Sequence, residues 1–248
     1  MQSNKGCKSS FCTCQPNSPQ KFDSLPGFGV SFLIKADSQI LTTTISFVRH
    51  GLVHNPKDVY YGRLPRFGLS EEGRRQVEAT AEYLARTPLA AVFCSPLLRA
   101  RQTAQIILAR HPGLKLHTTM LLYEAHTPFD GQPRTMLTAR QWDLYTGTGD
   151  GYEQPADIFQ RTQRFVTLVR RRYPNQHTVA VTHGDIIEFM MLWATGLRIL
   201  QTDLATILAH KQGNYPSPAS ISTFTYLTDQ VDEVPKYEYV VPYVMSNT

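Results

Sequence analysis

Short apolar runs alternate with amphipathic stretches along most of this chain. β-Branched, aromatic and other apolar residues gather in "ISFVRH" (45–50), "LAAVFCS" (89–95) and "TVAVTH" (178–183), and glycine or proline follows each run directly. Runs of this length and composition, closed by a turn-forming residue, are typical of buried strands. We therefore predict strands at these three places. Weaker patterns of the same kind predict shorter strands at 115–119, 220–227 and 237–244.

Between the strands, apolar residues recur at helical spacing. The stretch 69–86 has its apolar positions on one face, and Ser70 stands where a helix cap is expected. The second strand leads into a helix for which Ser95 is the expected N-cap, followed by a proline at the first helical position. Further helices are predicted over 156–173 and 185–196, the second of them closed by a glycine.

Alternating strands and helices predict the α/β class, and here a three-layer α/β/α sandwich with a mostly parallel central sheet. We assign residues 41–248 to this domain. Residues 1–40 form an N-terminal extension, of which 1–26 are rich in Ser, Pro, Asn and Gln and are expected to be poorly ordered. In such sheets ligands bind beyond the carboxyl ends of the strands, so the residues that follow each strand are the candidate binding residues.

Composition narrows the functional classes. The 248 residues are 42% hydrophobic and 18% charged, as in soluble globular proteins. A net charge of +5 favours anionic ligands without indicating a nucleic-acid surface. The apolar stretch 28–47 is interrupted by Lys35 and Asp37, so we expect no membrane-spanning helix there. We expect neither nucleic acid nor a membrane as a partner.

Cysteine usage points to a reducing compartment. Cys7, Cys12 and Cys14 cluster near the amino terminus and Cys94 stands alone, which is not the pattern of a disulfide framework. A zinc site among the first three is a minor alternative, because a matching second pair is lacking. No signal peptide is recognisable. The N-terminus lacks acidic residues, as transit peptides do, but a disordered tail is the favoured interpretation. We therefore expect a cytoplasmic protein.

Chemistry-bearing residues follow each of the three predicted buried strands. Arg49 and His50 close the first strand, Arg99 opens the helix after the second, and His183 closes the third. Guanidinium groups match phosphate oxygens, and a helix amino terminus adds backbone N–H groups and positive potential. A neutral imidazole is a competent nucleophile toward phosphorus, and surrounding cations oppose its protonation. The pattern predicts a phosphoryl-transfer site.

The motifs "FVRHG", "LSEEGRRQ", "SPLLRARQTA", "YEAHTPFDG" and "VAVTHGD" occur in one order over residues 43–227. This order resembles that of the histidine phosphatase superfamily, also called phosphoglycerate mutase-like. The resemblance implies the fold of that family and a reaction without metal or other cofactor. It makes His50 the phosphorylated nucleophile, and it assigns the phosphate pocket to Arg49, Arg99, His183 and the adjoining Gly184.

Two residues are candidates for the general acid. The resemblance implies Glu124, although "EAHTPFDG" departs from the commoner family pattern, and Asp185 is the alternative acid. By the same resemblance, Asn55 contacts the transferred phosphate. Leu52 and Val53 stand where the family often has Glu-Thr, which removes polar groups from the edge of the pocket. "YEQPADIFQRT" resembles a further family motif, with Tyr152 in place of its glycine.

Three functions are compatible with this reading. A phosphomonoesterase acting on a small-molecule phosphate ester is favoured. A phosphoglycerate mutase-type transferase is the alternative, but region 124–155 has only Arg134 and Arg140 as cations to grip a substrate carboxylate. An inactive phosphate-binding scaffold is less favoured, since such proteins usually lose a pocket residue. The natural substrate and the oligomeric state are left open.

Several other residues have structural interpretations. His54 is expected to face solvent in the loop after the first strand. The arginine run 170–172 is expected to complement the carboxyl end of a helix. Tyr60, Tyr61 and Arg63 lie in the first loop and are expected either to touch the substrate or to pack.

Overall fold

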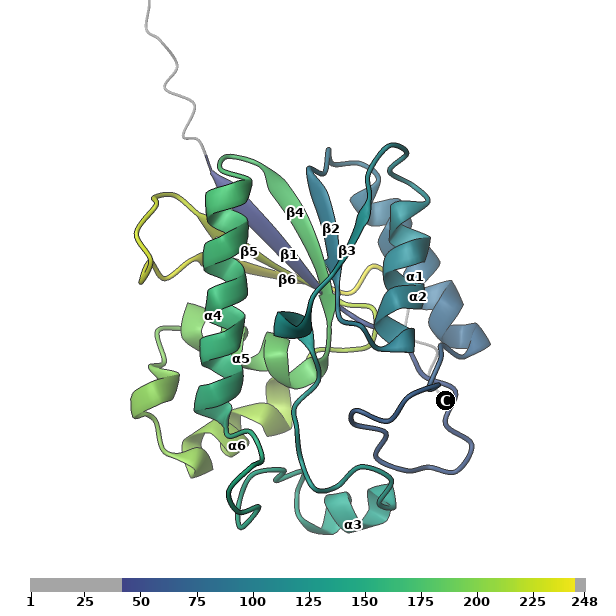
Figure 1. Ribbon diagram of the computed structural model, residues 1–248, viewed down its shortest axis with the longest axis vertical. Helices are drawn as coiled ribbons and strands as arrows, with labels where there is room; N and C mark the ends of the chain where they lie inside the picture. The colour runs from purple at the N-terminus through teal and green to yellow at the C-terminus, as the bar shows by residue number, and fades with distance from the viewer. Residues whose placement is uncertain (1–41, 244–248) are drawn as a thin grey trace, which may run out of the picture. The chain divides into compact units, whose positions relative to one another are not determined.

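A computed structural model describes residues 42–243 of the chain (Figure 1). Segment 1–26, for which poor order was predicted, lies outside the described residues, as do Cys7, Cys12 and Cys14 with the zinc alternative. The described residues form one mixed six-stranded sheet with helices on both faces. The predicted three-layer α/β/α class is therefore confirmed.

The sheet has the strand order β3-β2-β4-β1-β5-β6. Its strands are β1 (Thr43–Arg49), β2 (Ala91–Cys94), β3 (Leu116–Thr118), β4 (His177–Thr182), β5 (Ile221–Tyr226) and β6 (Lys236–Val240). The first four are parallel, whereas β5 and β6 pair antiparallel at one edge. All six strands were predicted to within a few residues, and the parallel part carries the three motif-bearing strand ends.

Helices cover the two faces of the sheet in pairs. α1 (Glu71–Leu84) and α2 (Leu98–Leu108) pack on one face, and α4 (Pro155–Arg172) and α5 (Gly184–Ala194) pack on the other. Successive residues of β1 point to opposite faces, so Phe47 enters the core under α4 and α5 while Val48 enters the core under α1 and α2. Both side chains are fully buried, which fixes the register of the central strand.

The two predicted helix caps have different outcomes. Ser70 is the N-cap of α1, and its hydroxyl accepts a hydrogen bond of 2.9 Å from the Gly73 amide. The prediction of Ser95 as the N-cap of α2 is wrong, because α2 begins at Leu98 and its cap residue is Leu97. The Ser95 hydroxyl instead accepts from the Leu97 amide at 3.4 Å, in the turn that precedes α2. The same hydroxyl also lies within hydrogen-bond distance of His183, as described below.

Four further elements were not predicted. They are the 3-10 helices η1 (Met120–Leu122) and η2 (Ile199–Gln201), the short helix α3 (Arg134–Ala139), and α6 (Leu204–Asn214). α3 is too short for a helical period to stand out. α6 depends on its N-cap Asp203, which accepts hydrogen bonds from the Thr206 amide and hydroxyl, both 2.9 Å long.

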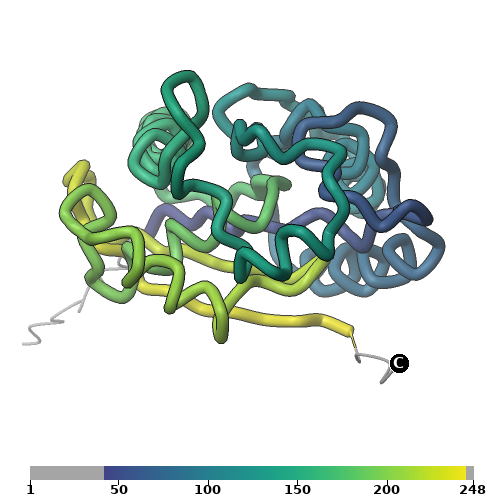
Figure 2. The backbone as a smooth tube through the Cα atoms, turned by 90° about the horizontal axis from the view of Figure 1, so that it is seen from below, coloured from purple at the N-terminus to yellow at the C-terminus, as the bar shows by residue number. Residues whose placement is uncertain are grey.

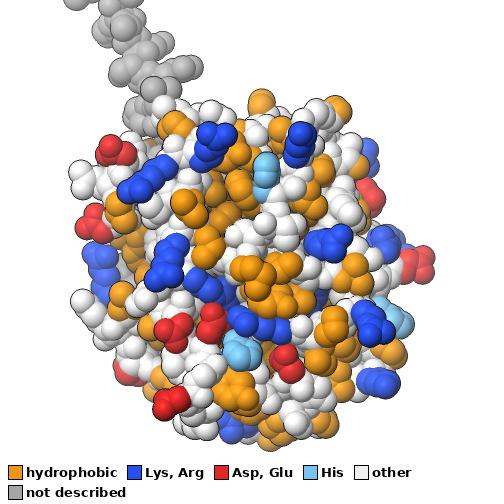
Figure 3. Space-filling model, in the orientation of Figure 1, with side chains coloured by type: hydrophobic (Ala, Val, Ile, Leu, Met, Phe, Trp, Pro, Cys, Tyr) orange, Lys and Arg blue, Asp and Glu red, His pale blue; other side chains and the backbone are white. Residues whose placement is uncertain are grey.

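The loops at the carboxyl edge of the parallel strands form one end of the molecule. Figure 1 shows β1 and β4 running toward these loops, and Figure 2 views the chain from that end. Segments 52–68 and 123–155, with α6, lie across it. No helix among residues 42–243 has the length and apolarity needed to cross a membrane. On the face in Figure 3, basic side chains are interspersed with acidic and hydrophobic ones.

Candidate active site

His50 lies at the carboxyl end of the central strand with only 2% of its surface exposed. Its backbone amide donates to Thr182 of β4, which holds the residue against the neighbouring strand. The ring Nδ1 lies 2.9 Å from the Gly51 carbonyl oxygen, and a carbonyl can only accept, so Nδ1 carries the proton. Nε2 therefore has the free lone pair. Burial, then the positive charges of Arg99 and Arg49, hold the pKa of His50 well below its ordinary value.

Arg99 is completely buried in the first turn of α2. Its Nη2 donates to the Gly62 carbonyl at 2.8 Å and lies 3.2 Å from Nδ1 of His183. The ring of Tyr61 covers the guanidinium at 4.7 Å. Nε and Nη1 of Arg99 are buried without a hydrogen-bond partner among the described residues. Buried donors are nearly always paired in native proteins, so these two are available to an anionic ligand.

His183 and the misassigned Ser95 are joined by a hydrogen bond. Nε2 of His183 lies 2.8 Å from the Ser95 hydroxyl, and its ring centroid is 5.3 Å from that of His50. Each histidine ends a parallel strand, as predicted, and the structure shows that the two strands, β1 and β4, are adjacent and that both rings are buried. Burial and the charge of Arg99 hold the pKa of His183 well below its ordinary value, so both rings are neutral near pH 7. Ser95 thus orients an imidazole.

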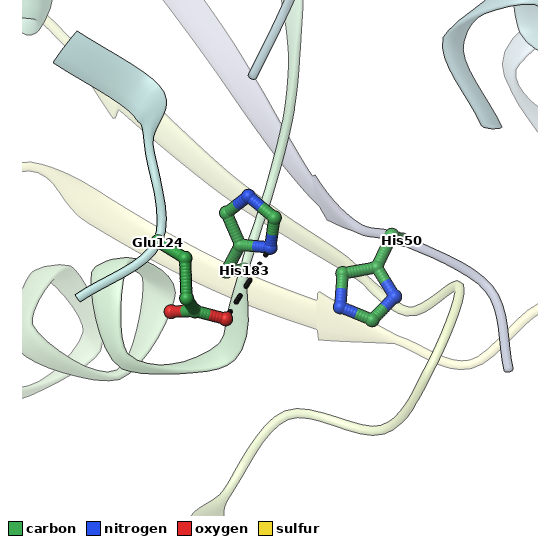
Figure 4. Close-up of side chains that lie close together, drawn as sticks. All are labelled: His50, Glu124 and His183. Carbon is green, nitrogen blue, oxygen red and sulfur yellow. Dashed lines mark ion pairs between the residues drawn. The ribbon is translucent and has the colours of Figure 1, made fainter. Parts of the chain in front are cut away.

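Glu124 joins this cluster from the loop after η1 (Figure 4). Its Oε2 lies 3.4 Å from Nδ1 of His183 and 3.5 Å from Nη2 of Arg99. The other carboxylate oxygen accepts from the Ala125 amide at 2.9 Å. Burial raises the pKa of Glu124, although the charge of Arg99 opposes this. The carboxyl group therefore keeps its proton at a higher pH than an exposed glutamate does.

Asp185, the alternative acid, is buried in a different set of contacts. Its carboxylate accepts from the hydroxyls of Tyr145 and Tyr215, the latter at 2.8 Å, and pairs with Nζ of Lys211 at 2.8 Å. Burial alone would raise the pKa of Asp185, but Lys211 and the two hydroxyls hold it below the ordinary value. The Asp185 carboxylate thus links α5 to α6 and to the loop that carries Tyr145.

Arg49 and Asn55 are placed differently from one another. The guanidinium of Arg49 donates to the Pro216 carbonyl and lies 4.9 Å from the ring of Tyr215, while its Nε is buried and unpartnered among the described residues. The amide of Asn55 donates to the Val59 carbonyl at 2.8 Å and closes a turn of the first loop. Asn55 is not among the residues that line the cavity described below, and its contact with phosphate stays a prediction.

The two glycines after the strand-end histidines are required by protein neighbours. A Cβ at Gly51 would lie 2.6 Å from the Gly73 carbonyl oxygen of α1, and one at Gly184 would overlap the hydroxyl of Tyr215. The close approach at Gly51 is therefore made by the backbone of α1, and the one at Gly184 by the side chain of Tyr215. Phosphate binding at Gly184, which is the first residue of α5, stays a prediction.

A cavity of about 650 Å³ opens from His50 toward the loops. Its lining includes Glu124 and Asp185, and also residues that the sequence did not single out as site residues, among them Trp142, Lys211 and Tyr215. For Tyr61, substrate contact or packing was expected. Its ring lies over the guanidinium of Arg99, and its ring centroid is 6.2 Å from that of His50. The aromatic residues in "YY" (60–61) and "QWDLY" (141–145) were the sequence signal that could have indicated this part of the cavity lining.

A metal ion is a poor fit to this cluster. Ligand atoms of His50, Glu124 and His183 lie within 4.8 Å of one another, which is a spacing that a metal could use. However, Nη2 of Arg99 already lies 3.2 Å from His183 and 3.5 Å from Glu124. A fixed cation at that position opposes a second one, and it makes the cluster an anion site instead.

Comparison with known proteins decides the family. The sequence model of the histidine phosphatase superfamily (branch 1) matches residues 45–228. This protein is a member of that superfamily. The match begins and ends within a few residues of the range over which the motifs were recognised, and it includes all of the strand-end residues described above.

Relatives of this superfamily member include named phosphatases. An uncharacterised protein of Mycobacterium tuberculosis (strain H37Rv) is 36% identical over 169 residues, covering 63% of this chain and 81% of the relative. The 5''-phosphoribostamycin phosphatase of Niallia circulans is 30% identical over 145 residues, covering 54% and 67%. Mycobacterial glucosyl-3-phosphoglycerate phosphatase has the same fold, with a TM-score of 0.65 at 22% identity over 81% of this chain and 98% of that one.

Proposed function

We propose that this protein hydrolyses phosphate monoesters in two steps, through a phosphohistidine on His50. In the first step, the bond between Nε2 of His50 and phosphorus forms while the ester P–O bond breaks, and Glu124 protonates the departing alkoxide. In the second step, water attacks phosphorus, the N–P bond breaks, and the Glu124 carboxylate takes the proton of that water. Family membership supports phosphoryl transfer as the reaction class.

The observation that carries the proposal is the set of buried, unpartnered donors beside the nucleophile. Nε and Nη1 of Arg99 and Nε of Arg49 lack partners among the described residues, and the free Nε2 of His50 belongs to the same cluster. A phosphoryl group bound there would satisfy these donors with its equatorial oxygens. The charge that builds on those oxygens in the transition state would be stabilised by the same contacts.

Glu124 is the better proton donor of the two candidate acids. Its pKa is raised by burial, whereas the pKa of Asp185 is held low by Lys211 and two tyrosine hydroxyls. A general acid must hold its proton near the working pH and reach the leaving oxygen. Glu124 belongs to the His50 cluster, while both carboxylate oxygens of Asp185 are already engaged.

The contacts of two nearby arginines favour hydrolysis over a mutase reaction, in which the phosphoryl group moves within a phosphoglycerate-like substrate. Such a mutase needs free cations to hold the substrate carboxylate. Arg140 donates to the carbonyls of Asp143 and Thr146 and is not among the cavity-lining residues. Arg134 lines the cavity but pairs with Asp58 at 3.3 Å. Neither of these arginines is available without breaking contacts.

The test is hydrolysis of a generic aryl phosphate by the purified protein. His50→Ala should reduce turnover to the uncatalysed background, because the nucleophile is lost while the rest of the site is kept. His54→Ala is the matched control, since this histidine lies four positions away and is exposed. A phosphorylated intermediate that is labile to acid, stable to base and absent in His50→Ala should accumulate on rapid quenching.

If His50→Ala retains turnover, the mechanism is contradicted. A second, independent preparation of the same variant serves to exclude a contaminating phosphatase. Circular dichroism of both variants shows whether the fold is kept, so that a loss of activity in His50→Ala alone reports on chemistry.

A further inference from the structure

We propose that the natural substrate class is a phosphate monoester whose alcohol carries an aromatic or heteroaromatic ring, with that ring held against Trp142. This inference rests on the proposed phosphatase function and extends it to the leaving group. It is drawn from the part of the cavity that lies beyond the phosphate-binding residues.

The cavity is larger than a phosphoryl group requires. Its volume of about 650 Å³ lies in the range of sites that enclose a drug-sized ligand. Beyond His50 and Arg49 its walls are largely apolar or aromatic, with Leu52, Tyr60 and Trp142 among the lining residues. Pockets of this make-up recognise an organic group by contact area and fix its orientation with a few polar groups.

Trp142 is held in a costly backbone conformation. Gln141 and Trp142 have φ angles of 53° and 60°, in the left-handed region that glycine ordinarily occupies after a helix. Their amides donate to the carbonyls of Thr138 and Leu137 and so close the end of α3, a task that needs no side chain. Both residues line the cavity, so side chains are kept there at positions where glycine would be less strained.

The indole is also held by packing. Trp142 packs partly buried against the hydrophobic core, and the guanidinium of Arg134 lies 5.3 Å from the centre of its ring. A preorganised aromatic face binds a planar ring without the entropy cost of ordering a mobile side chain. Base–aromatic stacking of this kind tolerates different rings, because every such ring offers a π face.

The cations in this part of the cavity already have acidic partners. Lys211 pairs with the buried Asp185 at 2.8 Å, and Arg134 pairs with Asp58 at 3.3 Å. A second anionic group on the substrate, such as a carboxylate, would have to compete with these acids. The amide side chains of Gln141 and Gln212, which also line the cavity, instead suit the uncharged donors and acceptors at the edge of a heteroaromatic ring.

The test compares 5′-AMP with ribose 5-phosphate, in which a hydroxyl group replaces the adenine ring at C1′. The wild-type kcat/KM should be at least about tenfold higher for AMP, within the range that stacking of one base on an aromatic side chain supplies. Trp142→Ala should remove this preference by lowering kcat/KM for AMP while leaving ribose 5-phosphate within about twofold. Trp142→Phe, which keeps an aromatic face, should retain most of it. For 3-phosphoglycerate, kcat/KM should not exceed that for ribose 5-phosphate.

Outcomes separate the two proposals. If neither ester is hydrolysed in a His50-dependent manner, the phosphatase function itself fails. If both are hydrolysed through His50 but AMP, UMP and pyridoxal 5′-phosphate have no advantage over ribose 5-phosphate, the ring proposal is wrong and the phosphatase stands. The ring proposal is also overturned if Trp142→Ala lowers kcat/KM equally for both substrates and Trp142→Phe is folded but equally impaired. Trp142 would then have a purely structural role.

Discussion

At the scale of single residues, the pKa values of two buried carboxyl groups shift in opposite directions because their neighbours differ. We expect Glu124→Gln to lower kcat/KM for an alkyl phosphate by about 10²- to 10⁴-fold, the usual contribution of a positioned acid. The effect on an activated aryl ester should be small, since its leaving group departs without a proton. Asp185→Asn should leave the ratio of alkyl to aryl rates unchanged, because Asp185 acts through Lys211 and two tyrosines.

The pH profile gives Glu124 an independent check. Glu124 must be protonated for the first step, so kcat/KM for the alkyl ester should fall as pH rises through its pKa, which burial raises. His50 must be neutral, and because its pKa is lowered, the acidic limb should lie below the ordinary histidine range. Glu124→Gln should abolish the alkaline limb alone. Persistence of that limb in Glu124→Gln together with its loss in Asp185→Asn would assign the acid to Asp185.

At the scale of elements, the loop that carries Glu124 is held by a charged network from α4. Arg161 donates to Glu153 at 2.7 Å, to the Leu121 carbonyl at 3.0 Å and to the Glu124 carbonyl at 3.3 Å. Arg63 donates to the same Glu124 carbonyl at 2.7 Å and to Glu153 at 2.8 Å. The "YEQPADIFQRT" motif thus supplies Glu153 and Arg161, which fix the position of the acid.

Arg161→Lys should therefore mimic a partial loss of the acid. Lysine keeps the charge but not the planar fork that reaches several acceptors at once. We expect a lower kcat for alkyl esters with little change in KM, and a much smaller effect on an activated aryl ester. Arg164→Lys, an exposed position on the same helix, is the control. An equal fall for both ester types would show that Arg161 serves the fold rather than the acid.

The elements that could be predicted are those with strong local signals. β1, β2 and β4 are β-branched runs closed by turn residues, and the exposed and buried positions of α1 repeat at a helical period. α6 has no comparable pattern, because Ile207 is its only buried residue. Ser95 shows the opposite error: its sequence context suits a cap, but its hydroxyl is bound by His183, 88 positions away.

At the scale of the whole molecule, the sheet topology predicts one part of the site, whereas Glu124 was predicted from the family resemblance alone. His50 and His183 end neighbouring parallel strands, so their meeting follows from strand order. The contacts of Asp185 with Tyr145 and Lys211 depend on where two irregular connections fold, and no local pattern encodes that. Trp142 was missed for the same reason, since its position depends on a strained helix end.

The unpartnered donors of Arg49 and Arg99 should couple phosphate binding to the stability of the whole domain. At a concentration about 100-fold above Kd, inorganic phosphate would stabilise the native state by about 2.7 kcal/mol, or about 5–10 °C in Tm for a domain of this size. Thermal unfolding should show this shift against chloride at equal ionic strength. Arg99→Met should abolish the shift because it removes the buried donors, while Arg101→Met, exposed on the same helix, should keep it. A full phosphate shift in Arg99→Met would mean that the anion binds elsewhere, and the pocket built on Arg99 would have to be abandoned.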